Sequence, residues 1–343
     1  MAGDSDSRSA ESLWRHSALS TGDKLFNLGL RFFFPLRNVP EKPEALGKMR
    51  AFMERIGADS FRKLSCTTVR TARGDGTDLE ILMITHPAHD PAKPAPLVLF
   101  FHGGGFTVGK AKDAALESWL ITPLSQKHGA NAVYASVEYR LAPEHASPAA
   151  FDDGERAFSF LTSSANLAQA HGYDLSKGVH IWGVSAGANL ALSVAASVCR
   201  RGERDKLASV FADCPMMNPP CDMPSFSRNA SSSMICPVKW LRWSWEVYLN
   251  AKTPEELGAA LNDPRTCPHT APGGFDGMSG LQVLLITALG DPLCDDGLQV
   301  RDALTKAGAA LTHVEMQASH CVGWMFDSTT AKCAWARLAT MLT

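Results

Sequence analysis

Short apolar runs alternate along this chain with stretches that carry apolar residues at helical spacing. Eight runs rich in branched and aromatic residues predict β-strands. They lie at residues 66–71, 79–85, 97–101, 132–137, 179–182, 209–212, 281–288 and 311–318. Helical stretches such as 151–162 and 297–307 separate most of the later runs. This alternation predicts an α/β fold with a mostly parallel sheet between helices, and the first two strands add an antiparallel edge.

Two segments depart from the alternation. Residues 1–60 predict N-terminal helices, because apolar positions recur at helical spacing from residue 13 to residue 56 between scattered prolines. We expect one apolar helix face there, made of Leu25, Leu28, Phe32 and Phe33. That helix either packs on the body, covers a substrate cleft or lies on a membrane surface. We favour the cleft, because a membrane-surface helix would carry more basic residues than this segment has. The second segment, at about residues 215–272, reads as an insertion in a body that spans residues 61–343.

The insertion contains a helix rich in large side chains. Residues 240–249 read Trp-Leu-Arg-Trp-Ser-Trp-Glu-Val-Tyr-Leu, which is more apolar surface than an exposed helix needs. Two interpretations stay open: the helix packs in the core, or its inner face walls an apolar pocket. The two interpretations are compatible.

Composition excludes several classes of protein. The 343 residues are 45% hydrophobic and 20% charged with a net charge of −2, which describes a globular protein without the basic surface that nucleic acid needs. The nine cysteines are scattered without a C-x-x-C pair, which argues against a disulfide framework and a zinc site and favours a reducing compartment. We find no signal-peptide pattern and no apolar run of bilayer length, so we expect a cytoplasmic protein, with the glycosylation sequon at Asn229 arising by chance.

A Gly-x-Ser-x-Gly string lies between a predicted strand and a predicted helix. Residues 183–187 read Gly-Val-Ser-Ala-Gly, after the apolar run 179–182 and before the Ala- and Leu-rich run 189–196. In this context the string predicts a nucleophile elbow, a strained turn that exposes Ser185 at the start of a helix. Ser185 is therefore the candidate nucleophile.

A run of three glycines follows another buried strand. Residues 101–106 read Phe-His-Gly-Gly-Gly-Phe, and successive glycines leave backbone N–H groups unshielded. A phosphate-binding loop is the competing interpretation, but no Lys-Ser or Lys-Thr follows at the required spacing. Together with the elbow, the run predicts an oxyanion hole.

A serine nucleophile needs a base and an acid that orients it, which in this fold follow the serine in the order acid, then histidine. Asp291 comes at the end of the strongest late strand, and His320 comes just past the last one. Asp295 and Asp296 are interpreted as caps of the next helix, and His313 as a structural residue within the last strand. The sequence thus predicts Ser185, His320 and Asp291 at one edge of the sheet.

These motifs resemble the hormone-sensitive-lipase family of α/β-hydrolases, the carboxylesterases that include arylacetamide deacetylases. The resemblance rests on residues 102–106, 138–145, 183–187, 262–265 and 291–297, and it covers the chain from about residue 79 onward. It implies Ser185 as nucleophile, His320 as base and Asp291 as its orienting acid. It also implies an oxyanion hole from the N–H groups of Gly104, Gly105 and Ala186, a loop shaped by His102 and Gly103, and a helical cap from the N-terminal helices and the insertion.

The chain departs from the family pattern at three positions near these residues. Val184 stands where Asp or Thr is usual, Ala188 replaces a second glycine, and Cys321 replaces the glycine that commonly follows the histidine. None of the three removes a group of the predicted triad, so we expect them to affect substrate preference.

The predicted function is hydrolysis of short- to medium-chain apolar carboxylic esters through an acyl-enzyme, with no cofactor and no metal. Two alternatives stay open: an arylacetamide-deacetylase-like amidase, and a non-catalytic ligand receptor like the plant hormone receptors that resemble this family. The expected partner is a small-molecule ester, and neither nucleic acid nor a membrane span is expected. An exposed edge strand could support a homodimer.

Overall fold

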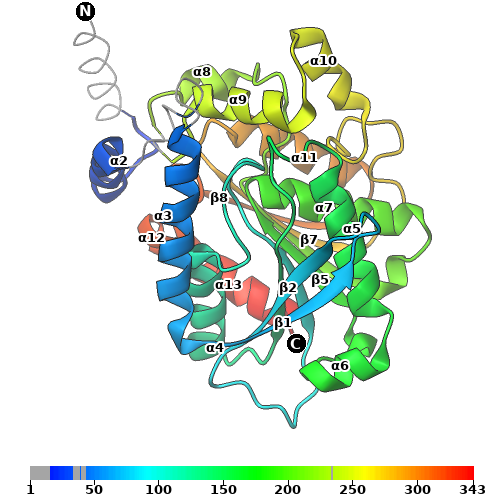
Figure 1. The fold of residues 1–343 in the computed structure, drawn as a ribbon. Coiled ribbons are helices and arrows are strands. Elements are labelled where there is room, and N and C mark those ends of the chain that lie inside the picture. Colours follow the sequence, from blue (N-terminus) through cyan, green and yellow to red (C-terminus); the bar gives the residue numbers. More distant parts are fainter. Residues whose placement is uncertain (1–15, 34–38, 40–43, 233–234) are drawn as a thin grey trace, which may run out of the picture.

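A single eight-stranded sheet organises the chain in the computed structural model, which describes residues 16–33, 39, 44–232 and 235–343 (Figure 1). Its strand order is β1-β2-β4-β3-β5-β6-β7-β8. The strands are β1 (Ser65–Ala72), β2 (Asp78–Thr85), β3 (Leu97–Phe101), β4 (Val133–Val137), β5 (Val179–Val184), β6 (Leu207–Asp213), β7 (Gln282–Ala288) and β8 (Ala310–Met316). All eight predicted strands are confirmed, with ends that differ by at most two residues.

The strands from β4 to β8 run parallel in the sheet, whereas β1 and β2 pair antiparallel. Every residue of β3, β4 and β5 is buried, as expected for strands covered on both faces. By contrast, β1 alternates between exposed and half-buried residues at the outer edge of the sheet. The homodimer through this edge stays a prediction.

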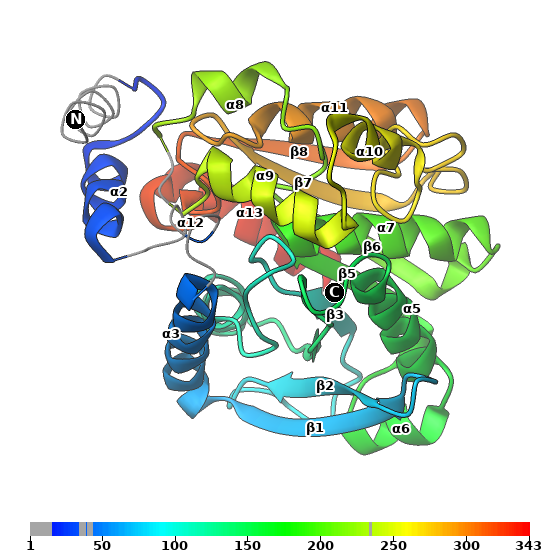
Figure 2. The same ribbon diagram turned by 45° about the horizontal axis from the view of Figure 1, so that its top comes forward.

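Helices cover both faces of the sheet (Figures 1 and 2). One apolar core lies between the sheet and α5, α7 and α11, and a second lies between the sheet and α4 and α13. The helices are α2 (Thr21–Phe33), α3 (Glu44–Ser60), α4 (Thr122–His128), α5 (Ala149–Thr162), α6 (Ala165–His171), α7 (Ala186–Arg200), α8 (Pro224–Arg228), α9 (Val238–Leu249), α10 (Pro254–Ala259), α11 (Cys294–Lys306), α12 (Gly323–Phe326) and α13 (Ser328–Met341). A π-helix at Leu116–Ile121 precedes α4. Within the described ranges, no helix combines the length and apolar character that crossing a bilayer requires.

The segment between β6 and β7 carries α8, α9 and α10, which gather at one end of the sheet (Figure 1). Trp245 and Tyr248 of α9 are fully buried. The ring of Phe106, from the predicted oxyanion loop, stacks on Tyr248 at a centroid distance of 3.8 Å. This helix therefore packs in the core, as the first of the two interpretations predicted.

The apolar face expected on the N-terminal helix is contradicted at Leu25 of α2, whereas Leu28 is half-buried. Leu25 is 54% exposed, whereas Asp23 and Asn27, one turn apart, are fully buried. The side chains of Phe32 and Phe33 lie outside the described residues. Polar residues take the inner face because they bind polar groups of the loop that carries His320.

Candidate active site

The turn around Ser185 joins β5 to α7 in a strained conformation. Ser185 has φ 57° and ψ −119°, a region that residues with a side chain rarely occupy. Its N–H donates to the carbonyl of Asp213 at 2.8 Å, which ties the turn to the end of β6. A Cβ at Gly187 would lie 2.0 Å from the carbonyl oxygen of Phe101, so only glycine lets α7 approach β3 this closely. The turn has the geometry that the sequence predicted.

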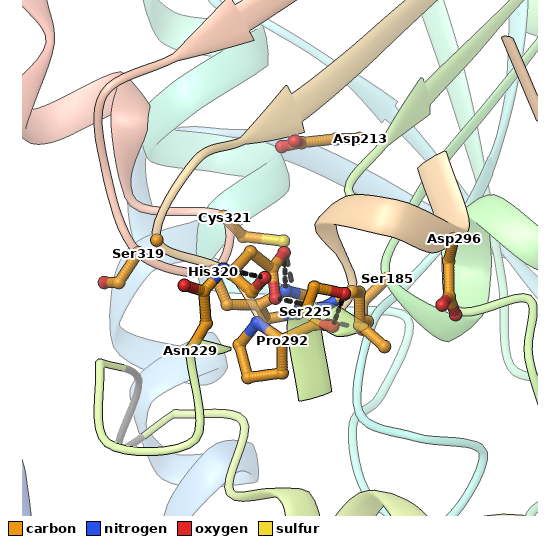
Figure 3. Close-up of polar contacts among 12 residues, drawn as sticks. Ser185, Asp213, Ser225, Asn229, Pro292, Asp296, Ser319, His320 and Cys321 are labelled. Carbon is orange, nitrogen blue, oxygen red and sulfur yellow. Dashed lines mark hydrogen bonds and ion pairs between the residues drawn. The ribbon is translucent and has the colours of Figure 1, made fainter. Parts of the chain in front are cut away.

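Ser185, His320 and Asp291 are linked by consecutive hydrogen bonds, although they are far apart in sequence. Figure 3 labels Ser185 and His320 within this network. The Ser185 hydroxyl lies 3.0 Å from Nε2 of His320, and Nδ1 of His320 lies 2.6 Å from Oδ2 of Asp291. The second oxygen, Oδ1 of Asp291, accepts the N–H of Leu293 at 2.9 Å. The side chains of these three residues are each at most 4% exposed. This is the geometry of a nucleophile, a base and an orienting acid.

Two opposing effects act on the pKa of His320. Burial lowers it, because desolvation disfavours the imidazolium, while the carboxylate of Asp291 raises it by charge and by hydrogen bonding. The net effect is a pKa raised above the usual value for histidine. An imidazole that gains proton affinity from its carboxylate partner is suited to take a proton from Ser185.

The glycine run passes beside Ser185 and is shaped by His102. Nδ1–H of His102 donates to the carbonyl of Gly103 at 2.7 Å, and the imidazole stacks on the ring of Tyr139 at 4.1 Å. The Tyr139 hydroxyl donates to the carbonyl of His102 at 2.7 Å. Burial lowers the pKa of His102 to about 4, so its imidazole stays neutral at physiological pH.

Three backbone N–H groups are free to face a ligand beside Ser185. Among the described residues, no hydrogen bond occupies the N–H of Gly104, Gly105 or Ala186. Gly104 has φ 118°, and a Cβ there would lie 2.1 Å from the carbonyl oxygen of Val108. A side chain at Gly104 would therefore displace the loop. The Ala186 N–H belongs to the first turn of α7, where N–H groups have no partner within the helix.

The run at residues 138–145 connects the loop after β3 to α3 and α5. The carboxylate of Glu138 accepts the N–H of Ala111 at 2.8 Å, and the guanidinium of Arg140 pairs with buried Asp153 at 3.0 Å. From α3, Arg50 donates to the carbonyl of Thr107 at 2.8 Å and also binds Glu144. These contacts explain why the motif resemblance extends to residues that do not touch Ser185.

Asp113, which the sequence analysis did not single out, also anchors the loop. Its carboxylate accepts the N–H groups of Gly103 and Ala115. The burial of this carboxyl raises its pKa to about 6. No sequence pattern marks Asp113, because its partner Gly103 lies ten positions earlier, near the start of the loop that follows β3.

A second unpredicted group holds the loop of His320 from the N-terminal side. The carboxylate of Asp23, on α2, accepts both the N–H and the hydroxyl of Ser319 at 2.7 Å. The amide of Asn27 donates to the Ser319 hydroxyl at 2.9 Å and to Asp23 at 2.6 Å. Burial raises the pKa of Asp23, and the hydrogen bonds from Ser319 oppose that shift. Helix α2 thus fixes the residue next to His320.

Replacing Asp23 with alanine is expected to lower kcat for an ester substrate about ten- to a hundredfold with little change in KM. The Ser319 N–H and the Asn27 amide would lose their buried acceptor, and the displaced imidazole would align poorly with Ser185. Steady-state kinetics checks this, with Leu25→Ala on the exposed side of α2 as control. Asp23→Asn, which keeps one acceptor oxygen, should recover part of kcat. An unchanged kcat in Asp23→Ala would contradict the positioning role.

Asn229, the residue of the sequon, belongs to the structure around Asp291. It is fully buried, and its amide donates to the carbonyls of Leu289 and Asp291 at 2.9 Å and 2.8 Å. Nearby, the hydroxyl of Ser225 donates to the carbonyl of Pro292 at 2.6 Å (Figure 3). These bonds fix the loop that carries the acid.

The interpretation of Asp295 and Asp296 as helix caps is wrong. Helix α11 begins after Leu293, and no side chain among the described residues caps it. Asp296 is buried and accepts the N–H groups of Met217 and Asn218, each at 2.9 Å. Asp295 accepts the N–H of Ser225 at 2.8 Å. Both carboxylates lie in the first turn of α11, where Asp296 holds the loop after β6 and Asp295 accepts an N–H from the first turn of α8.

A small cavity of about 120 Å³ opens at Ser185 and His320. Apolar side chains from several elements line it, while Asp113 adds one carboxyl group. The larger apolar side chains of the lining are Met53, Val108, Trp119, Val184, Ile235 and Trp240. Trp240 of α9 therefore walls an apolar pocket, as the second interpretation of that helix predicted. Of the three positions that depart from the family pattern, Val184 and Cys321 line the cavity, whereas Ala188 is buried in α7.

Comparisons with known proteins agree with the fold described above. Residues 98–322 match the model of a family described as alpha/beta hydrolase fold. The chain is 30% identical over 280 residues to carboxylesterase NlhH of Mycobacterium tuberculosis (strain ATCC 25618 / H37Rv). The aligned region covers 80% of this chain and 76% of that protein. It is 29% identical over 219 residues to gibberellin receptor GID1 of Oryza sativa subsp. japonica, which covers 63% of this chain and 58% of the receptor.

A solved structure of a thermostable esterase from Pseudomonas putida ECU1011 has the same fold, with a TM-score of 0.77 at 20% identity over 96% of this chain and 99% of that one. The chain belongs to the α/β-hydrolase fold family. Within that family it belongs to the hormone-sensitive-lipase branch, which confirms the resemblance seen in its motifs.

Proposed function

We propose that this protein is a serine carboxylesterase that hydrolyses short- to medium-chain apolar esters through an acyl-enzyme. The observation that carries the proposal is the continuous hydrogen-bonded chain from Ser185 through His320 to Asp291. The similarity to carboxylesterase NlhH supports ester hydrolysis as the reaction.

In the first half of the reaction, Ser185 attacks the ester carbonyl while Nε2 of His320 takes the hydroxyl proton. Asp291 stabilises the imidazolium that forms. The N–H groups of Gly104, Gly105 and Ala186 donate to the oxyanion of the tetrahedral intermediate, where a single donor is worth on the order of 10²–10³ in rate. His320 then protonates the departing alcohol, which leaves the acyl group on Ser185.

In the second half, water repeats the attack on the acyl group, with His320 again as the base. The acid leaves, and Ser185 regains its proton. Every proton transfer uses a side chain already placed in the site, so these steps call on no cofactor.

We further propose that α2, α3 and the segment at about residues 215–272 form a cap over this site. Met53 of α3, Ile235 and Trp240 of α9 all line the cavity at Ser185. Contacts from α2 to Ser319 and from α3 to Thr107 join these helices to the two loops that carry the reacting groups.

The test is reaction with a fluorophosphonate probe together with hydrolysis of p-nitrophenyl acetate and butyrate. An esterase reacts with the probe and hydrolyses both esters. A receptor on this fold would do neither, and an amidase would prefer the matching anilides. Either of these results would overturn the proposal.

The size of the cavity predicts a limit on acyl chain length. Because about 120 Å³ is small for a ligand pocket, kcat/KM for p-nitrophenyl esters should peak at short or medium acyl chains and fall for long ones. Trp240→Ala should shift the optimum to longer chains. The matched control is Trp243→Ala, on the same helix but not in the cavity. A kcat/KM that rises steadily to the longest chain would contradict this limit.

A further inference from the structure

Three cysteines surround the imidazole of His320. Cys214 follows β6, Cys236 lies in the segment before α9, and Cys321 follows His320 directly. All three thiols are reduced and buried. Cys214 and Cys321 meet at the group proposed as the base because β6 and β8 end at the same edge of the sheet, and the segment before α9 brings Cys236 to the same place.

One set of these groups has the spacing of a metal site. Sγ of Cys214, Sγ of Cys321 and a ring nitrogen of His320 all lie within 4.8 Å of one another. The Cys321 sulfur is 3.4 Å from Nε2 of His320 (Figure 3). In a tetrahedral zinc site, the usual bond lengths separate a sulfur from a nitrogen ligand by roughly 3.6 Å. The three atoms thus need little movement to share one ion.

The backbone holds both cysteines in place. Cys214 has φ 47° and Cys321 has φ 56°, left-handed conformations that non-glycine residues rarely adopt. The N–H of Cys214 donates to the carbonyl of Ile286 at 3.0 Å, which ties it to β7. Such conformations persist only where the surrounding structure determines them, and they gather at functional sites.

The chemistry of the donors selects the ion. Two thiolates and one imidazole are ligands that favour zinc and other borderline-soft cations over magnesium or calcium. The buried carboxylates of Asp213 and Asp291 add negative charge close by. A hydrogen bond with Cys321 and burial raise the pKa of Cys214 well above the usual value for cysteine, so this thiol is protonated in the free protein. Each thiol that binds a metal gives up its proton to water.

A second grouping, of Cys236, Asp291 and His320, is less suited to an ion. The Asp291 side of the ring is Nδ1, which already donates to the carboxylate at 2.6 Å. An ion there would have to displace this bond to a carboxylate. An ion at Nε2 would displace only the 3.0 Å bond from the neutral Ser185 hydroxyl, on the side of the ring that lines the cavity.

We propose that Cys214, Cys321 and Nε2 of His320 form an inhibitory site for a borderline-soft divalent cation such as Zn²⁺. The cation enters through the cavity lined by Ser185, His320 and Cys321. Once bound, it occupies the nitrogen lone pair that would take the proton of Ser185, so the imidazole can no longer act as a base. Inhibition rests on the proposed esterase function, but the binding site does not.

Cadmium binding to the reduced protein tests the site without an activity assay. Cd²⁺ is titrated into the full chain in a metal-free buffer with a phosphine reductant, and the ultraviolet sulfur-to-cadmium charge-transfer band is recorded. We expect one ion per chain, displaced by Zn²⁺. Cys321→Ser and Cys214→Ser should each weaken binding at least tenfold, whereas Cys236→Ser and the exposed Cys333→Ser should not. Cys321→Ser alone decides the matter if Cys214→Ser does not fold.

The same variants are then assayed for hydrolysis of p-nitrophenyl butyrate with added Zn²⁺. Reversible inhibition relieved by a chelator, with an inhibition constant at least tenfold higher in Cys321→Ser, supports the site. The proposal is overturned by a charge-transfer band of equal affinity in Cys321→Ser, or by the absence of a band. If the protein hydrolyses no ester, the band still tests the metal site, so the two proposals fail separately.

Discussion

Replacing Ser185 with alanine is expected to lower kcat/KM for short-chain aryl esters by a factor on the order of 10⁶. The reason is that the acyl-enzyme cannot form without the hydroxyl, and no other hydroxyl is bonded to Nε2 of His320 among the described residues. Residual hydrolysis would come from substrate binding and the oxyanion hole. Steady-state kinetics with p-nitrophenyl butyrate measures the effect.

The structure offers a matched control for this variant. Ser193 lies two turns further along α7 and is also buried, but its hydroxyl donates to Asn189 and not to the imidazole. Ser193→Ala should keep kcat/KM within a few-fold of the wild type. Ser185→Ala should keep its melting temperature, because within the described part of the chain the Ser185 hydroxyl bonds to no side chain other than His320. Hydrolysis near the wild-type rate in Ser185→Ala would exclude this residue as the nucleophile.

Replacing Asp291 with asparagine is expected to lower kcat by a factor on the order of 10⁴. The substitution keeps the shape of the side chain, but its amide can donate to Nδ1 of His320 and so favour the tautomer with the proton on Nε2. That tautomer cannot take the proton of Ser185. Asp302→Asn, on the exposed side of α11, is the control for the loss of one negative charge.

The pH profile gives this variant a second readout. Activity needs the neutral imidazole, and Asp291 raises the pKa of His320 despite burial, so the acid limb of kcat/KM in the wild type should lie above pH 6.5. Asp291→Asn removes the charge that raises the pKa of His320, while the burial that lowers this pKa remains. The acid limb of kcat/KM should therefore move to lower pH. A wild-type limb below pH 6 would contradict the ion pair as described.

The pattern of apolar runs along the sequence was enough to predict the sheet and the edge at which the proposed reacting groups lie. Buried parallel strands read as continuous apolar runs, and residues at their carboxyl ends meet at one edge, so Asp291 and His320 could be proposed before any geometry was known. Ser185 lies between β5 and α7 in the turn that its flanking glycines predicted.

Contacts between distant segments could not be predicted in this way. Asp23 binds Ser319 from 296 positions away, and the inner face of α2 is polar because it satisfies that loop. Hydrophobic periodicity finds an apolar face and therefore missed this one. The cysteines around His320 were missed because they come from separate segments, two after strands and one before α9, with no fixed spacing.

The most direct test of the account is to find which residue a fluorophosphonate probe modifies. The labelled protein is digested, and tandem mass spectrometry locates the phosphonyl group. We predict a single modification on Ser185, with no labelling after Asp291→Asn at matched times. Labelling of any other residue, or ester hydrolysis by a protein whose Ser185 stays unmodified, would contradict the assignment of Ser185 as the nucleophile.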